Sequence, residues 1–132
     1  MIIIFFKNNK FLLFAIIYVM LIFYVSSIAG NHLPKFKILS FDKIIHCCVY
    51  FVFGILIFLA INEKGKYHNK QILFLTIIIG LLYGISDEIH QLFVLNRSAS
   101  VYDVIADFIG VIIGSFLVFQ ICKYLNNRKI KL

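Results

Sequence analysis

Long hydrophobic runs with almost no charged residues, separated by short polar segments, dominate the pattern of residues along this chain. Four such runs cover about residues 11–29, 44–61, 71–86 and 104–122. Their apolar residues come in blocks rather than in the period of an amphipathic helix. The run lengths approach the roughly 20 residues that a helix needs to cross a hydrocarbon core of about 30 Å. The pattern predicts an all-α integral membrane bundle of four transmembrane helices with short loops, with residues 1–132 as a single domain.

Composition and charge place this bundle in a membrane and suggest its orientation. With 62% hydrophobic residues, 14% charged residues and a mean hydropathy of +0.98, the chain is unlike an ordinary soluble domain. Its basic residues divide into nine on one side of the runs (Lys7, Lys10, Lys64, Lys66, Lys70, Lys123, Arg128, Lys129 and Lys131) and four on the other (Lys35, Lys37, Lys43 and Arg97). The positive-inside rule then predicts a multi-pass protein of the cell membrane with both termini cytoplasmic. The net charge of +7 is a topology signal, and no nucleic-acid partner is expected.

The first hydrophobic run also has the features of a secretory signal peptide. Lys7 and Lys10 would form its basic segment, residues 11–25 its apolar segment, and Ser27-Ile28-Ala29 a cleavage site with small residues. Cleavage after Ala29 would leave three spans and would not change the sidedness of the rest. We expect the run to be retained as a helix.

Polar side chains gather at the ends of the second, third and fourth runs. Because successive spans alternate in direction, these ends all face the outer surface. The residues are Asp42, Lys43 and His46, then Asp87, Glu88, His90 and Gln91, then Arg97 and Ser98 on the loop, and then Asp103 and Asp107. Asp107 lies one turn inside its apolar run and therefore needs His46, Arg97 or a proton as a partner. Charge so close to hydrocarbon is costly and is seldom kept without a partner or a function. The sequence therefore predicts one polar site at the outer leaflet.

The residue types in this site suggest chemical roles. Asp42 and His46 are four residues apart and share a helix face, so His46 could serve as an acid–base catalyst. Asp87 and Glu88 are further catalytic candidates, as a base or as ligands of a hard divalent cation, although no cofactor is required by the sequence. The binding candidates are Lys43, Gln91, Arg97, Asp103 and Asp107. We expect the Arg97 guanidinium to pair with the Asp87–Glu88 or the Asp103–Asp107 carboxylates.

Structural interpretations of the same residues remain open. Asp42 could cap a helix, and Ser100 to Asp103 matches the capping-box pattern. His46 alone would often be a buried histidine with a satisfied hydrogen bond, and the Asp87–Glu88 pair could form a structural ion pair with Arg97. Small residues spaced four apart, at Gly80 and Gly84 and again at Gly110 and Gly114, usually mark close helix packing.

Together these blocks resemble the VanZ-like membrane protein family. The resemblance rests on Asp42-Lys43-x-x-His46 with Tyr50 and Gly54, on Asp87-Glu88-x-x-Gln91 with Phe93, and on Arg97, Asp103, Asp107, Gly110 and Gly114. It covers roughly residues 20–120 and implies a small bacterial multi-span protein. The family is named for a member associated with teicoplanin resistance. Where this chain has Asp107 the family often has Asn, so the chain carries an additional charge there.

Three functions from different classes follow. The resemblance implies a protein linked to lipoglycopeptide resistance, which acts on or shields an envelope lipid or a lipid-linked precursor at the outer leaflet. The alternatives are a membrane enzyme that uses acid–base or metal-assisted chemistry on a lipid-linked substrate, and a structural or accessory membrane protein without catalytic activity. The expected partners are the lipid bilayer and, for the first function, a precursor or the lipoglycopeptide itself.

Overall fold

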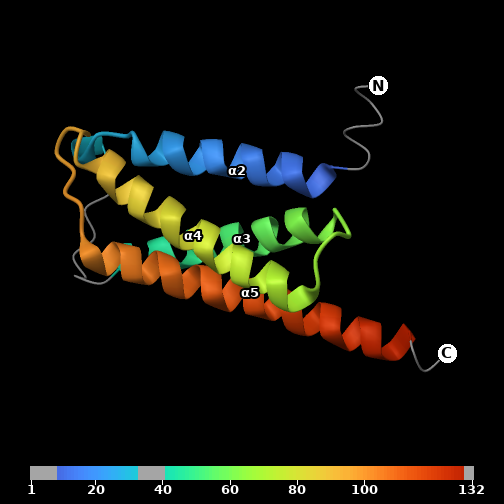
Figure 1. Ribbon diagram of the computed structural model, residues 1–132. Coiled ribbons are helices and arrows are strands. Elements are labelled where there is room, and N and C mark those ends of the chain that lie inside the picture. Colours follow the sequence, from blue (N-terminus) through green and yellow to red (C-terminus); the bar gives the residue numbers. More distant parts are fainter. Residues whose placement is uncertain (1–8, 33–40, 130–132) are drawn as a thin grey trace, which may run out of the picture.

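The computed structural model describes residues 9–32 and 41–129, and the regular structure in these residues is entirely helical (Figure 1). The elements are α2 (Lys10–Ser26), a short 3-10 helix η1 (Gly30–His32), α3 (Phe41–Asn62), α4 (Asn69–Gln91) and α5 (Val101–Lys129). Each predicted hydrophobic run is helical over most of its length. The basic residues Lys7, Lys35, Lys37 and Lys131, which entered the charge count, lie outside the described residues.

Three of the helices are long and apolar enough to cross a membrane, and α2 is shorter. At 1.5 Å per residue, α3 and α4 are about 33 Å long, whereas the 17 residues of α2 give only about 25 Å. Many large apolar side chains also face outward, such as Tyr24 (67% exposed) and Phe74 (65% exposed). A surface of this kind is suited to lipid, so the chain is a membrane protein that associates with the bilayer.

The helix ends differ from the predicted runs. The second, third and fourth helices extend beyond the runs, so that the polar residues at 42–43, 87–91 and 103 lie inside helices rather than next to them. In contrast, α2 ends at Ser26, three residues before the predicted end. Both the backbone N–H and the hydroxyl of Ser27 bond to Phe23 O, and the N–H of Gly30 bonds to Leu95 O on the α4–α5 loop. The chain therefore leaves the helix and turns toward that loop.

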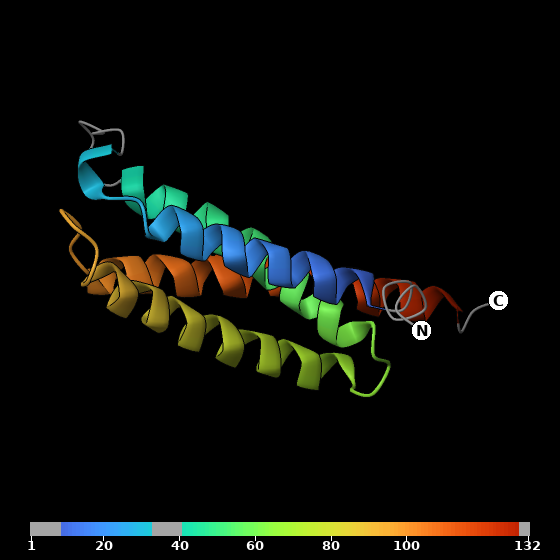
Figure 2. The ribbon, with the colours of Figure 1, turned by 90° about the horizontal axis from the view of Figure 1, so that it is seen from above.

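The helices run in alternating directions. Figures 1 and 2 show the start of α2 and the end of α5 at one end of the bundle, together with the α3–α4 connection. The opposite end, which we call the polar end, contains the C-terminal ends of α2 and α4, the N-terminal ends of α3 and α5, and the α4–α5 loop. The predicted gathering of three helix ends on one side is confirmed.

Glycines allow α3 and α5 to form the most extensive interface in the bundle. A Cβ atom at Gly110 or Gly114 would collide with the backbone carbonyl of Cys47 or Phe51, respectively. A Cβ at Gly54 would lie 2.7 Å from Val111 O. These glycines bring the two backbones into direct contact, and for Gly110 and Gly114 this confirms the packing role predicted from their spacing.

The first helix is attached to the other helices by side-chain hydrogen bonds to their backbones. The Tyr18 hydroxyl donates to Val49 O (3.0 Å) on α3, and the Tyr83 hydroxyl of α4 donates to Val19 O (2.9 Å). Ile22 packs in a buried cluster with residues of α3 and α5. Consequently α2 is an integral wall of the bundle even though it is shorter than the other α-helices in the described residues.

Candidate functional site

The buried centre of the polar end is an ion pair between α3 and α5. His46 Nδ1 lies 3.0 Å from Asp107 Oδ1, and their side chains are 16% and 1% exposed. Asp107 is thus a carboxylate deep in an apolar bundle whose partner is an imidazole. The sequence left His46, Arg97 or a proton as the possible partners of Asp107, and the structure shows His46 in this role. The sequence also placed His46 near Asp42 because the two residues share a helix face, but the partner of the Asp42 carboxylate is Lys43.

Asp42 and Asp103 share a different partner. Lys43 Nζ lies 2.6 Å from Asp42 Oδ2 and 2.7 Å from Asp103 Oδ1, so it joins the first turns of α3 and α5. Asp42 lies inside the first turn of its helix, which begins at Phe41, and so it is not the N-cap residue. The Asp103 side chain likewise pairs with Lys43, although the capping-box pattern had assigned it to the backbone of its own helix.

Asp87 and Glu88 are both buried, at 5% and 4% exposed, but they face different partners. Glu88 Oε2 accepts a 2.8 Å hydrogen bond from the backbone N–H of Ser100, at the start of α5. Asp87 Oδ2 accepts one from Gln91 Nε2 (3.2 Å) within α4. Neighbouring residues on a helix project about 100° apart, so the two carboxylates belong to separate parts of the site.

Glu88 is the acidic residue of α4 that lies close to the pair formed by His46 and Asp107. One ligand atom from each of Glu88, His46 and Asp107 lies within 4.8 Å of the other two. Three different helices, α3, α4 and α5, therefore contribute to one compact group of possible metal ligands. Asp87, the other metal candidate from the sequence, is not part of this group among the described residues.

Arg97 differs from its prediction. Its guanidinium bonds to two backbone carbonyls near the end of α2, with Nε 3.3 Å from Ile28 O and one terminal nitrogen 3.2 Å from Val25 O. The other terminal nitrogen lies 3.4 Å from Gln91 Oε1. The ion pairs in the described part of the chain do not include Arg97. The two carbonyls lie at and just beyond the C-terminal end of α2, where the helix dipole concentrates partial negative charge, and this attracts the guanidinium.

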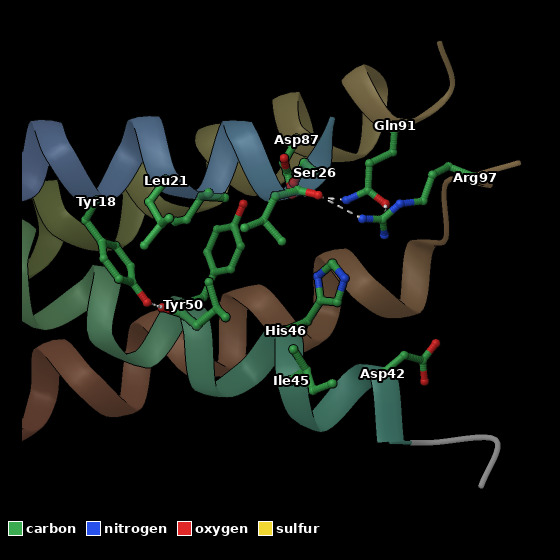
Figure 3. Close-up of a pocket in the computed structure, with 13 residues that line it drawn as sticks. Tyr18, Leu21, Ser26, Asp42, Ile45, His46, Tyr50, Asp87, Gln91 and Arg97 are labelled. Carbon is green, nitrogen blue, oxygen red and sulfur yellow. Dashed lines mark hydrogen bonds between the residues drawn. The ribbon is translucent and has the colours of Figure 1, made fainter. Parts of the chain in front are cut away.

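A cavity of about 340 Å³ lies between α2, α3 and α4 at the polar end. Its apolar wall includes Leu21, Ile22 and Val25 of α2. Its polar lining comes from Tyr18, Ser26, Asp42, His46, Tyr50, Asp87, Gln91 and Arg97. Figure 3 shows His46 and Tyr50 extending from α3 toward α2 and α4, with Asp42 and Arg97 at the same end of the cavity. The volume falls within the range of sites that hold small molecules.

Several residues of the site were not among the sequence candidates. Tyr18, Ser26 and Tyr50 line the cavity, and the Tyr50 hydroxyl is buried without a hydrogen-bond partner among the described residues. On the other side of α2, Ser27 Oγ lies 3.0 Å from His90 Nε2. Tyr50 is a polar residue within an apolar run, and this feature of the sequence could have indicated that it belongs to the site. Tyr18 and the serines depend on the packing of α2, for which the sequence holds no comparable signal.

Comparison with known proteins agrees with the sequence blocks. A model of the VanZ/LLP1 family matches residues 2–123. No match was found among curated proteins or among solved structures. The match extends over nearly the whole chain and includes all the residues of the polar end. This chain is therefore a member of the VanZ/LLP1 family and a VanZ-like membrane protein.

Proposed function

We propose that this protein binds an envelope lipid or lipid-linked precursor in the cavity at its polar end, and that this binding lowers the sensitivity of a bacterial cell to lipoglycopeptides such as teicoplanin. In this proposal all four α-helices cross the cell membrane as a single domain, and both chain termini are cytoplasmic. The polar end then lies at the outer leaflet, where envelope precursors and lipoglycopeptides meet the membrane.

The composition of the cavity supports this proposal. Its α2 wall, from Tyr18 to Ser26, extends for about 12 Å along the helix and is mainly aliphatic. Its opposite lining carries the imidazole of His46, the carboxylate of Asp87 and the guanidinium of Arg97. An acyl chain along the wall and a polar head group beside these side chains would match both surfaces. A soluble polar ligand would leave the aliphatic wall without a partner, so an amphiphile fits better.

The role in resistance comes from the family rather than from the geometry. The sequence blocks that the VanZ-like family shares with this chain include most of the polar residues around the cavity. Lipoglycopeptides combine an acyl chain with a large polar core, so they approach the membrane at the depth expected of this site. A protein that shields or alters their lipid-linked target there would change drug sensitivity.

The proposal is tested by filling the cavity. Val25→Trp places a large side chain on the cavity wall, whereas Phe14→Trp places the same side chain on the outward face of the same helix, where Phe14 is 53% exposed. At matched expression in a susceptible Gram-positive host, we expect Val25→Trp to abolish both the change in lipoglycopeptide sensitivity and the lipid that copurifies with the protein. Phe14→Trp should retain both. Equal behaviour of the two folded variants would contradict the proposal.

A specific observation also favours a second function, that of an enzyme acting on a lipid-linked substrate. His46 lines the cavity and is held by a buried carboxylate, an arrangement that orients an imidazole for proton transfer. Profiling of lipids and precursors in cells with wild-type protein or Glu88→Gln separates the possibilities. A changed lipid species favours the enzyme, and altered drug sensitivity with identical lipids favours binding or shielding. No difference in either, with a well-folded mutant, favours the structural role.

A further inference from the structure

The group formed by His46, Glu88 and Asp107 contains two buried oxygens without a hydrogen-bond partner in the described part of the chain. Glu88 Oε1 and Asp107 Oδ2 are buried and have no hydrogen-bond partner among the described residues. Their side chains are almost fully enclosed, with residue exposures of 4% and 1%. Leaving a buried polar atom unpaired costs about 1–3 kcal/mol, and more if the group is charged. Two such atoms in one group of three residues indicate that a ligand is expected at this position.

The charges around the group point to a cation. Five of the six carboxylates in the chain lie at the polar end, whereas the lysines and arginines described there are Lys43 and Arg97. Lys43 is paired with Asp42 and Asp103, and Arg97 binds backbone carbonyls and Gln91. Within the described chain, Glu88 and Asp107 therefore have no lysine or arginine to balance them, and His46, the partner of Asp107, can carry at most one positive charge for the two carboxylates.

The donor types restrict the kind of cation. One imidazole nitrogen and two carboxylates form a mixed nitrogen and oxygen set. Magnesium and calcium prefer oxygen ligands alone, whereas manganese and zinc accept imidazole together with carboxylate. The donor atoms lie within 4.8 Å of one another, so small side-chain movements would bring all three to the bond lengths of about 2.0–2.3 Å that such an ion requires. Three protein ligands would leave at least one coordination position for water or for a ligand group.

We propose that His46, Glu88 and Asp107 bind one divalent transition-metal ion, of the Mn²⁺ or Zn²⁺ type. The ion neutralises two buried carboxylates and ties α3, α4 and α5 together below the cavity. Because His46 also lines the cavity, the ion lies next to the space proposed for an amphiphile. The inference does not depend on which amphiphile the cavity holds, or on whether it holds one.

The test uses the full chain purified in detergent, stripped with a chelator and then equilibrated with MnCl₂, ZnCl₂ or MgCl₂. We expect roughly one Mn²⁺ or Zn²⁺ per chain, with at least tenfold weaker binding after Glu88→Gln or Asp107→Asn. Asp87→Asn is the matched control, because it removes the neighbouring buried carboxylate, which is outside the group. It should bind the metal as the wild type does.

A spectroscopic measurement on the wild type covers the case in which a variant fails to fold. Mn²⁺ bound to His46 should show magnetic coupling to an imidazole nitrogen in pulsed electron paramagnetic resonance. The absence of that coupling, the absence of stoichiometric binding, or an equal loss in Asp87→Asn and Glu88→Gln would overturn the inference. Val25→Trp should still bind the metal, so failure of the metal site and failure of amphiphile binding give different results.

Discussion

Replacement of Arg97 tests how the end of the short helix α2 is stabilised. Arg97→Met removes the three hydrogen bonds that the guanidinium makes, at 3.2–3.4 Å, to Val25 O, Ile28 O and Gln91 Oε1. Hydrogen bonds from charged donors contribute about 1.5–3 kcal/mol, and these are long, so about 1 kcal/mol each is appropriate. The expected loss is about 3 kcal/mol in the free energy of unfolding, or roughly a hundredfold in the equilibrium constant.

Arg97→Lys should recover only part of this loss. A lysine keeps the favourable charge at the helix C-terminus, which contributes about 0.3–1 kcal/mol, but it cannot reach three acceptors with a planar fork. The assay is equilibrium unfolding in mixed micelles, followed by far-ultraviolet circular dichroism. Lys70→Met is the control, because Lys70 is an exposed cation at the start of α4, far from the polar end.

Two results would refute this reasoning. In one, Arg97→Met would be no more destabilising than Lys70→Met, which would mean that the α2 carbonyls do not depend on the guanidinium. In the other, a double-mutant cycle between Arg97→Met and Asp87→Asn would give a coupling energy larger than the free energy assigned to the hydrogen bonds of Arg97 with backbone carbonyls. That coupling would restore the pairing of Arg97 with a carboxylate that the sequence suggested.

Three further predictions concern packing, polarity and topology. Gly114→Ala should destabilise the α3–α5 interface by about 1–3 kcal/mol in the same unfolding assay, because the added methyl group collides with the carbonyl of Phe51. Tyr50→Phe should leave the stability of delipidated protein unchanged or slightly raised, since its hydroxyl has no partner among the described residues; a loss above about 1 kcal/mol would reveal a partner. Cysteines introduced at Lys66 and Ser98 should be labelled from opposite sides of the membrane, and labelling of both from outside would exclude the proposed topology.

The positions of the helices could be predicted from the sequence, whereas their ends could not. A hydrophobic run indicates which residues cross the apolar layer, and in all four cases a helix covers most of the run. The ends depend on tertiary partners that lie far away in the chain. The turn after Ser26 is held by Arg97 and by the α4–α5 loop, about 70 residues later. Local pattern carries no information about such contacts.

The membership of the site was easier to predict than its pairings. Alternation of helix direction is sufficient to bring the charged ends of three helices together, and the structure does so. Spacing within one helix then suggested that His46 faces Asp42, but an i,i+4 relation shows only that two residues share a face. Which residue of α5 meets that face depends on the rotation of α3 against α5, which the sequence pattern does not specify. Asp87 and Glu88 face different partners for another reason, since neighbouring residues of α4 project about 100° apart.

The glycines of α5 provide the physical link between the packing and the site. Gly110 lies one helical turn beyond Asp107, and it contacts the carbonyl of Cys47, the residue next to His46. Because there is no Cβ at Gly110, the two backbones approach closely enough for the short side chains of His46 and Asp107 to meet at 3.0 Å. A Cβ at position 110 would collide with Cys47 O, so a larger residue there would push the helices apart and lengthen the contact between His46 and Asp107. The small residues that look purely structural in the sequence therefore set the geometry of the polar end.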